Sequence, residues 1–115
     1  MRMVDDELLG THRQELRRGT MVLASLLALR APEYGYALLK RLEIAGLPSD
    51  GNTIYPLLRR LEERGLLVSE WNTDDTRPRK FYRTSPAGDE LAQQLMTDMT
   101  NLTASLHALN GGPDR

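Results

Sequence analysis

The sequence predicts a mainly α-helical domain with one small β-hairpin. Three segments with a helical spacing of apolar residues come first, and the clearest of them starts at Gly51 and stops at Gly65. Two short strand-like segments follow, separated by the turn-rich residues 72–78. A long amphipathic segment then closes the chain. The order helix, helix, helix, hairpin, long helix predicts a winged helix-turn-helix followed by a C-terminal helix.

Length, composition and charge fit one globular domain. The chain has 115 residues, of which 40% are hydrophobic and 27% charged, with a net charge of −1 and no cysteine. The lack of cysteine excludes disulfides, thiolate metal ligands and cysteine nucleophiles, and it suits the cytoplasm. The longest apolar run, residues 21–29, is far shorter than the roughly 20 residues that span a bilayer. We therefore expect a cytoplasmic protein that does not contact a membrane.

The chain divides into four predicted parts. Residues 1–14 form an N-terminal arm, loose or as a short helix, because they are polar and mixed in charge. Residues 15–85 form the winged helix-turn-helix domain. Residues 86–110 form a C-terminal dimerisation helix, and residues 111–115 a tail.

Apolar spacing and helix breakers place the first two helices. The first is predicted over residues 15–29 and ends before Pro32, and the second over residues 35–45, where Gly46 closes it. The side chains expected to face inward are Leu16, Val22, Leu23, Leu26, Leu27 and Leu29 from the first helix, and Ala37, Leu38, Leu42 and Ala45 from the second.

The third helix has two different sides. Its inward stripe consists of Ile54, Leu57, Leu58 and Leu61. The other side and its flanks hold Asn52, Thr53, Tyr55, Pro56 and Arg59. A helix divided in this way can bury one side and present polar, cationic and aromatic groups to the major groove of DNA. The alternative is a winged-helix adaptor that binds proteins and not DNA, because a fold alone does not define a function.

The predicted hairpin pairs residues 66–71 with residues 80–84. Phe81 and one face of Trp71 are expected to face the core. The cations at or just past the tip are Arg77, Arg79 and Lys80. Cations in this place can neutralise DNA phosphates, although a solvated edge strand often carries the same residue types.

Two tyrosines near helix starts have two interpretations. Tyr36 and Tyr55 can each hold a phosphate through the hydroxyl or lay the ring against a sugar or base. Each can equally be a half-buried ring that only packs against its neighbours.

The last helix carries a signal for a partner. Ser85 fits its N-cap and Pro86 its first position. Apolar residues then recur at heptad spacing, at Ala92, Leu95, Met99, Leu102, Leu106 and Leu109. This seam predicts a homodimer contact supported by the first helix, with folding back onto the same domain as the alternative. A symmetric pair would present two reading helices about 34 Å apart, which fits a palindromic operator.

No enzymatic or metal site is predicted. The two histidines, His12 and His107, lie at opposite ends of the chain, and there is no nucleophile beside a base and no phosphate loop. We expect no cofactor. A metal site between two copies, with His107 near Glu90 or Asp98, has only weak support.

Several motifs together resemble the PadR family of bacterial transcriptional regulators. They are Gly35-Tyr36-Ala37, Thr53-Ile54-Tyr55-Pro56-Leu57-Leu58-Arg59-Arg60-Leu61-Glu62 and Arg79-Lys80-Phe81-Tyr82. The resemblance covers residues 16–91 and is closest to the short-tailed subfamily. It implies DNA contacts at Tyr36, Asn52, Thr53, Tyr55, Pro56 and Arg59, with Arg79 and Lys80 on the wing. Thr84 and Ser85-Pro86 depart from the family pattern where the wing meets the last helix.

The resemblance also implies a function. Members of this family are homodimeric repressors that bind double-stranded DNA and release it when a small molecule binds. We expect the same here, with a possible effector pocket between the first and last helices lined by Met21, Met96 and Met99. For each methionine, filling the core is the favoured interpretation. The alternatives are the protein-binding adaptor and a metal or ligand sensor.

Overall fold

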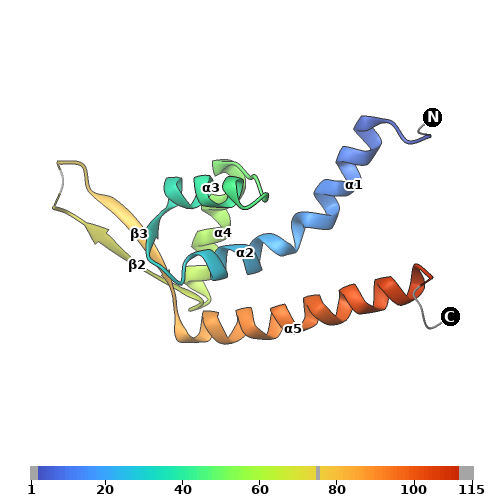
Figure 1. The fold of residues 1–115 in the computed structure, drawn as a ribbon. Coiled ribbons are helices and arrows are strands. Elements are labelled where there is room, and N and C mark those ends of the chain that lie inside the picture. Colours follow the sequence, from blue (N-terminus) through green and yellow to red (C-terminus); the bar gives the residue numbers. More distant parts are fainter. Residues whose placement is uncertain (1–2, 75, 112–115) are drawn as a thin grey trace.

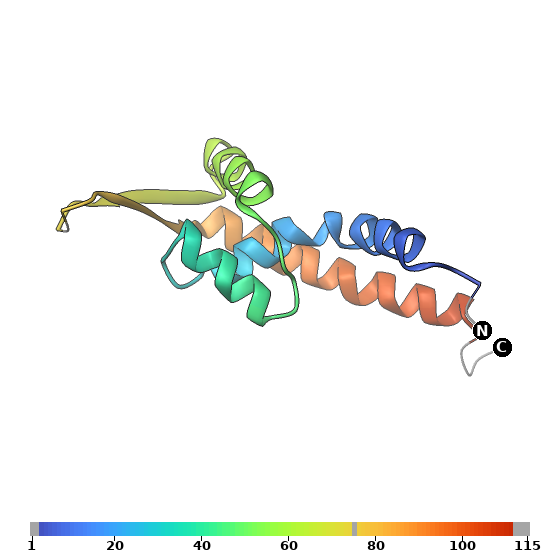
Figure 2. The same ribbon diagram turned by 90° about the horizontal axis from the view of Figure 1, so that it is seen from above.

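The computed structural model describes residues 3–74 and 76–111 and is elongated, measuring 59 × 32 × 21 Å. Its elements are α1 (Asp6–Arg18), α2 (Thr20–Ala28), β1 (Glu33–Tyr34), α3 (Gly35–Ile44), α4 (Gly51–Glu63), β2 (Leu67–Asn72), β3 (Arg79–Thr84) and α5 (Pro86–Leu109). The hairpin extends from one end of the body, and α1 and the end of α5 extend from the other (Figures 1 and 2). This confirms the predicted fold class of helices with a small sheet. Residues 112–115 of the predicted tail lie outside the described residues.

The prediction of a single first helix over residues 15–29 was wrong. Two helices occupy this region, and they meet at Gly19, which caps the end of α1 and the start of α2. The first begins at Asp6 because the Asp5 side chain accepts a hydrogen bond from the Leu8 N–H at 2.8 Å. Acids in its first turn and arginines in its last turn complement the helix dipole. The N-terminal arm is therefore helical over most of its described residues.

Helices α3 and α4 form the predicted helix-turn-helix. The Asp50 carboxylate caps α4 by accepting from the Thr53 N–H at 2.9 Å. Gly65 follows the helix with φ of 76°, in the left-handed region that glycine adopts without strain. The inward stripe of Ile54, Leu57, Leu58 and Leu61 is buried, as predicted. Ala45 is exposed, contrary to its predicted inward position, because α3 has already ended at Ile44.

The sheet has three antiparallel strands in the order β1-β3-β2. Strand β1 was not predicted, since its two residues are too few to show an alternating pattern. In the longer pair, Ser69 lies opposite Tyr82 and Trp71 opposite Lys80. We call β2, β3 and the loop between them, residues 67–84, the wing.

The core lies between α2, α3, α4, the base of the wing and the start of α5. Its buried apolar side chains include Leu26, Leu29, Leu38, Ile54, Leu58, Leu61, Leu67, Tyr82 and Ala92. Two expectations for this core were wrong. Leu16 is 76% exposed because α1 extends away from the body. Trp71 is 64% exposed because it lies near the end of β2 that leads to the tip of the wing.

The junction between the wing and α5 is closely hydrogen bonded. The Thr84 hydroxyl donates to the Leu26 carbonyl at 2.6 Å, and the Thr84 N–H to the Leu29 carbonyl at 2.9 Å. Thr84 thereby satisfies carbonyls at the end of α2 that lack helical donors. The Ser85 hydroxyl donates to the Gly65 carbonyl and accepts from the Gly88 N–H, which confirms it as the N-cap of α5.

Gly88 is expected to tolerate no side chain. A Cβ at this position would lie 2.1 Å from the carbonyl oxygen of Leu66, which is backbone and cannot move aside. We expect Gly88→Ala to lower the free energy of unfolding by about 2 kcal/mol, as overpacking of a core does. Urea denaturation would measure this loss. Gly10→Ala is the control, because nothing lies within 4 Å of its Cβ, and equal midpoints for the two variants would contradict the prediction.

Candidate nucleic-acid interface

One exposed side of α4, from Asn52 to Arg59, presents the helix side chains that the sequence assigned to DNA. Asn52, Thr53, Tyr55 and Arg59 are exposed and Pro56 is partly exposed, on the side opposite the buried leucines. Arg59 makes no ion pair or side-chain hydrogen bond within residues 3–74 and 76–111. This side of α4 is therefore available to a groove.

Tyr55 also has a structural role. Its ring covers Gly35 at the start of α3 and Gly51 at the start of α4, where a Cβ would lie 2.5 Å and 3.0 Å from ring carbons. Only a residue without a side chain leaves room for the ring at Gly35. Tyr55 is 38% exposed, so it both packs between the two helix starts and reaches the surface.

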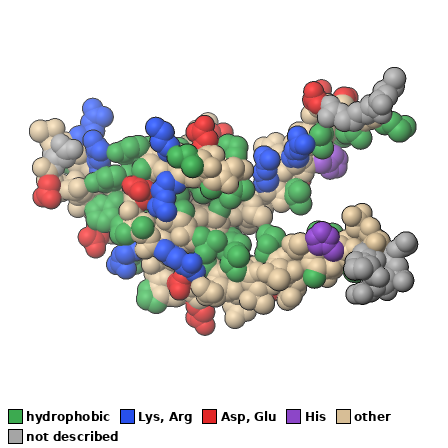
Figure 3. Space-filling view, viewed as in Figure 1, with side chains coloured by type: hydrophobic (Ala, Val, Ile, Leu, Met, Phe, Trp, Pro, Cys, Tyr) green, Lys and Arg blue, Asp and Glu red, His purple; other side chains and the backbone are tan. Residues whose placement is uncertain are grey.

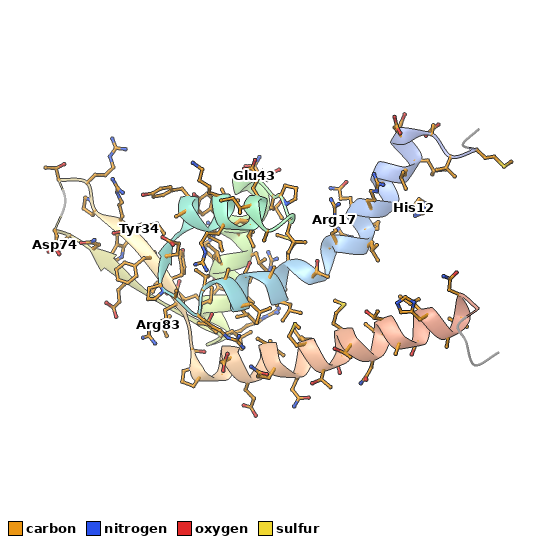
Figure 4. All side chains as sticks on the ribbon, in the orientation of Figure 1. His12, Arg17, Tyr34, Glu43, Asp74 and Arg83 are labelled. Atoms are coloured by element: carbon orange, nitrogen blue, oxygen red, sulfur yellow. The ribbon has the colours of Figure 1, made fainter. Side chains whose placement is uncertain are left out.

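Arg79 is held on one face of the wing by two tyrosines. Its Nη1 donates to the Tyr36 hydroxyl at 2.8 Å, and its guanidinium lies 5.6 Å and 5.7 Å from the ring centroids of Tyr34 and Tyr36. The two rings stack with 5.8 Å between centroids, and the Tyr34 hydroxyl accepts from the Asn72 amide at 2.7 Å. Figure 4 shows Tyr34 between α3 and the wing. The cluster fixes the wing against α3 with the arginine charge retained.

Lys80 is held on the other face. Its Nζ lies 3.0 Å from Oε1 of Glu62 on α4, and both side chains are about one-third exposed, at 31% and 32%. The ammonium also lies 5.3 Å from the centroid of the Tyr82 ring. The second carboxylate oxygen of Glu62 accepts a hydrogen bond from the Ser69 hydroxyl on β2. The role of Glu62 was not predicted, because nothing in the sequence of a single helix shows which strand residue will lie beside it.

These contacts favour the charged forms of both groups. The hydrogen bond from Ser69, followed by the contact with Lys80, lowers the pKa of the Glu62 carboxyl below its usual 4.5 against the effect of partial burial. The hydrogen bond to Glu62 raises the pKa of the Lys80 ammonium above its usual 10.5.

A cleft of about 610 Å³ separates the helix starts from the wing. Its lining is aromatic and cationic: Tyr34, Gly35, Tyr36, Tyr55, Trp71, Arg77, Arg79, Lys80 and Tyr82. The cleft brings together four of the predicted contacts, Tyr36, Tyr55, Arg79 and Lys80, and Trp71 joins them unpredicted. The other predicted contacts, Asn52, Thr53, Pro56 and Arg59, do not line it. Figure 3 shows Lys and Arg side chains over the wing, and Figure 4 places Asp74 at its tip.

The predicted dimer residues divide into two groups along α5. Leu95 and Met99 are partly buried, whereas Leu102, Leu106 and Leu109 are 59%, 60% and 84% exposed. A groove of about 350 Å³ lies between α1, α2 and α5. Its lining residues are Leu16, Gly19, Thr20, Leu23, Leu95, Asp98, Met99 and Leu102. Of the three methionines expected at such a pocket, only Met99 lines it. Met21 is buried in the core, and Met96 lies outside the lining and is 42% exposed.

The described residues hold neither a candidate metal site nor a membrane-spanning helix. No cluster of three or more histidine or carboxylate side chains suited to a metal ion is present among residues 3–74 and 76–111. None of the described helices has the length and apolar character needed to cross a bilayer.

Helices α2, α3 and α4, with the turn between α3 and α4 and the wing, define a winged helix-turn-helix protein. The model of the PadR-like family of transcriptional regulators matches residues 22–94, so the chain belongs to that family of DNA-binding regulators, which are not enzymes.

Solved structures agree with this assignment. The crystal structure of a PadR family transcriptional regulator from Eggerthella lenta superposes with a TM-score of 0.87 at 43% identity, covering 90% of this chain and 93% of that chain. A PadR-like transcription factor from Bacteroides fragilis gives a TM-score of 0.73 at 27% identity, covering 86% and 98%. The transcriptional regulator Rv3488 of Mycobacterium tuberculosis is 46% identical over 55 residues, which are 48% of this chain and 51% of that protein. The match thus spans about half the length of that curated relative.

The ion pair of Glu62 gives stability a defined pH dependence. Because the folded-state pKa of Glu62 lies below 4.5, its stabilising contribution is complete above that value and is lost as pH falls through the folded-state value. Replacing the carboxyl by an amide in Glu62→Gln removes this contribution. We therefore expect the difference in unfolding free energy between the wild type and Glu62→Gln to shrink below pH 4.5.

Urea titrations at neutral and acidic pH would measure that difference. Glu63→Gln is the control, since Glu63 is exposed and makes no ion pair within the described residues. The prediction would be contradicted if the difference in unfolding free energy between wild type and Glu62→Gln stayed constant from neutral to acidic pH.

Proposed function

We propose that this chain is a homodimeric, sequence-specific transcriptional repressor that acts in the cytoplasm and is released from DNA by a small molecule. The observation that carries the proposal is the exposed polar side of α4 beside the wing cations Arg77, Arg79 and Lys80. Its physical consequence is that one domain can contact a groove and the neighbouring phosphates together.

In the proposed complex, α4 enters the major groove. Asn52, Thr53 and Arg59 lie near base edges, because amide and guanidinium groups form paired hydrogen bonds with purines. Tyr55 and Pro56 lie against the sugar–phosphate backbone. Tyr36 and Arg79 act as one unit, in which the Tyr36 hydroxyl accepts from the arginine and can still donate its own proton to a phosphate.

The proposed dimer contact is the apolar seam of α5 with the exposed leucines of α1. The residues are Leu95, Met99, Leu102, Leu106 and Leu109, as the heptad spacing predicts. The exposure of these two helices supports the proposed contact, since α1 has no buried residue and α5 buries only Gly88 and Ala92. Leucines left in water along two projecting helices gain free energy when a second copy covers them.

The groove between α1, α2 and α5 is the proposed effector site. It is mainly lined by aliphatic side chains and adjoins the seam, so an apolar molecule bound there would change the angle between the two helices. Such a change would alter the spacing of the two α4 helices and thus the affinity for DNA.

Selection of bound duplexes from a random pool tests the proposal as a whole. We expect a palindromic consensus with half-sites about 34 Å apart, or one turn of DNA. Failure of the wild type to enrich any sequence, or to bind any duplex at low salt, would refute it.

Arg59 is expected to contribute to both affinity and specificity. Arg59→Ala should weaken binding to the selected duplex by about 1–3 kcal/mol and relax the preference at the base pair it contacts. Fluorescence anisotropy with matched and mismatched duplexes measures both effects. Arg64→Ala is the control, because Arg64 is the C-cap of α4 and lies beyond its last helical residue. Equal losses for the two arginines would contradict the assignment of Arg59 to a base contact.

Leu102 is expected to be necessary for the dimer. Leu102→Asp places a charge in the proposed seam and should yield monomers in sedimentation analysis, since an unpaired buried charge costs several kcal/mol. Thr100→Asp, two residues earlier and about 160° around the helix, should leave the dimer intact. An unchanged mass for Leu102→Asp would point to another contact surface.

A further inference from the structure

The two neighbouring cations of the wing differ in what they touch. Side chains alternate along a strand, so Arg79 points toward the tyrosines of β1 and α3, while Lys80 points toward α4. Sequence alone gives both residues the same role of phosphate contact. Both cations lie near aromatic rings, but Lys80 donates to a carboxylate, whereas Arg79 donates to a tyrosine hydroxyl.

Glu62 connects three elements with one carboxylate. Oε1 accepts from Lys80 on β3, Oε2 accepts from Ser69 on β2, and the residue itself lies in the last turn of α4. The helix that reads DNA is thereby attached to both strands of the wing beyond the apolar core. Both partners of the ion pair are about two-thirds buried, so water and salt screen the pair less than a surface pair.

The geometry of this contact matters for binding because α4 and the wing touch different parts of one duplex. Both can bind at once only when the angle between α4 and the wing places the wing on the phosphates while α4 lies in the groove. A wing that swings freely would lose conformational entropy on binding, whereas a wing already held at the right angle avoids that cost.

We propose that Glu62 and Lys80 are positioning residues: their ion pair, with Ser69, holds the wing at the angle to α4 at which both contact DNA, and Lys80 does not bind a phosphate. This inference rests on the proposed DNA-binding function. It gives Lys80 a different role from Arg77 and Arg79, which remain the proposed phosphate contacts of the wing.

Anisotropy titrations against the duplex recovered from the random pool, over about 50 to 200 mM salt, test the inference. Lys80→Met and Glu62→Gln should each weaken binding by about tenfold, and the double variant should be no weaker than either single one, because the two residues act as a pair. The slope of log Kd against log salt should stay at the wild-type value. Lys80→Arg, which keeps the charge, should restore most of the affinity.

Arg77→Met is the matched control for a wing cation. Arg77 is exposed at the tip, and its removal should flatten the salt slope by about one, as the loss of one phosphate contact does. If Lys80→Met flattens the slope in the same way and Glu62→Gln tightens binding, Lys80 is a phosphate contact released by the loss of its acid, and the inference is overturned.

Two further outcomes distinguish a failure of the positioning role from a failure of DNA binding and from a failure to fold. Should the wild type bind while both single variants bind equally well, the positioning role is wrong and the DNA-binding proposal stands; a wild type that binds no duplex ends both. Should a variant unfold, Ser69→Ala serves instead, because it removes only the hydrogen bond to Glu62. It should weaken binding by a few fold without changing the salt slope, and wild-type affinity would overturn the inference.

Discussion

Strand β3 is the element on which the rest of the structure depends. It pairs with β1 on one edge and β2 on the other, and Thr84 at its end bonds to two carbonyls near the end of α2. β1 runs directly into α3 and α5 starts directly after β3, so this strand determines where α3 starts, where the wing points and where α5 leaves the body. Buried backbone groups must keep their partners, which makes any shift of β3 costly.

The cations near α4 fall into held and exposed groups. Arg79 is held by two tyrosines and Lys80 by Glu62, whereas Arg59 and Arg77 are exposed. A held side chain has already lost rotamer freedom on folding, so it loses less on binding, while an exposed one can adapt to the bases or phosphates it meets. The interface therefore combines a rigid frame, made by α4 and the wing, with adjustable contacts at its edges.

The two ends of the molecule have opposite character. The helix-turn-helix and the base of the wing enclose a complete core, but α1 and the outer half of α5 expose leucines along their length. Isolated helices of this length gain most of their stability from packing an apolar face. The same exposure that supports the proposed dimer would therefore also make the angle between α1 and α5 sensitive to whatever fills the groove between them.

Local signals were enough to predict much of this protein from its sequence. Helix α4 could be placed from the periodic leucines and Gly65, and α5 from Ser85 and Pro86, because caps and breakers act on residues within one turn. Spacing also placed the polar side of α4 outward. The motifs around Tyr36, Tyr55 and Lys80 indicated the family. Asp5, with acids in the following turn, is also a helix-start signal and could have located α1.

Tertiary structure decided the features that join distant parts of the chain. Residues far apart in the sequence meet where β1 pairs with β3, where the ring of Tyr55 covers Gly35 and where the carbonyl of Leu66 lies against Gly88. The exposure of Trp71 was likewise decided by how the wing extends from the body. The different surroundings of Arg79 and Lys80 arise in the same way, from tyrosines on one side of the strand and Glu62 on the other. Sequence periodicity reports which side of an element is apolar, but not which neighbour that side will meet, because the neighbour is chosen by packing of the whole chain.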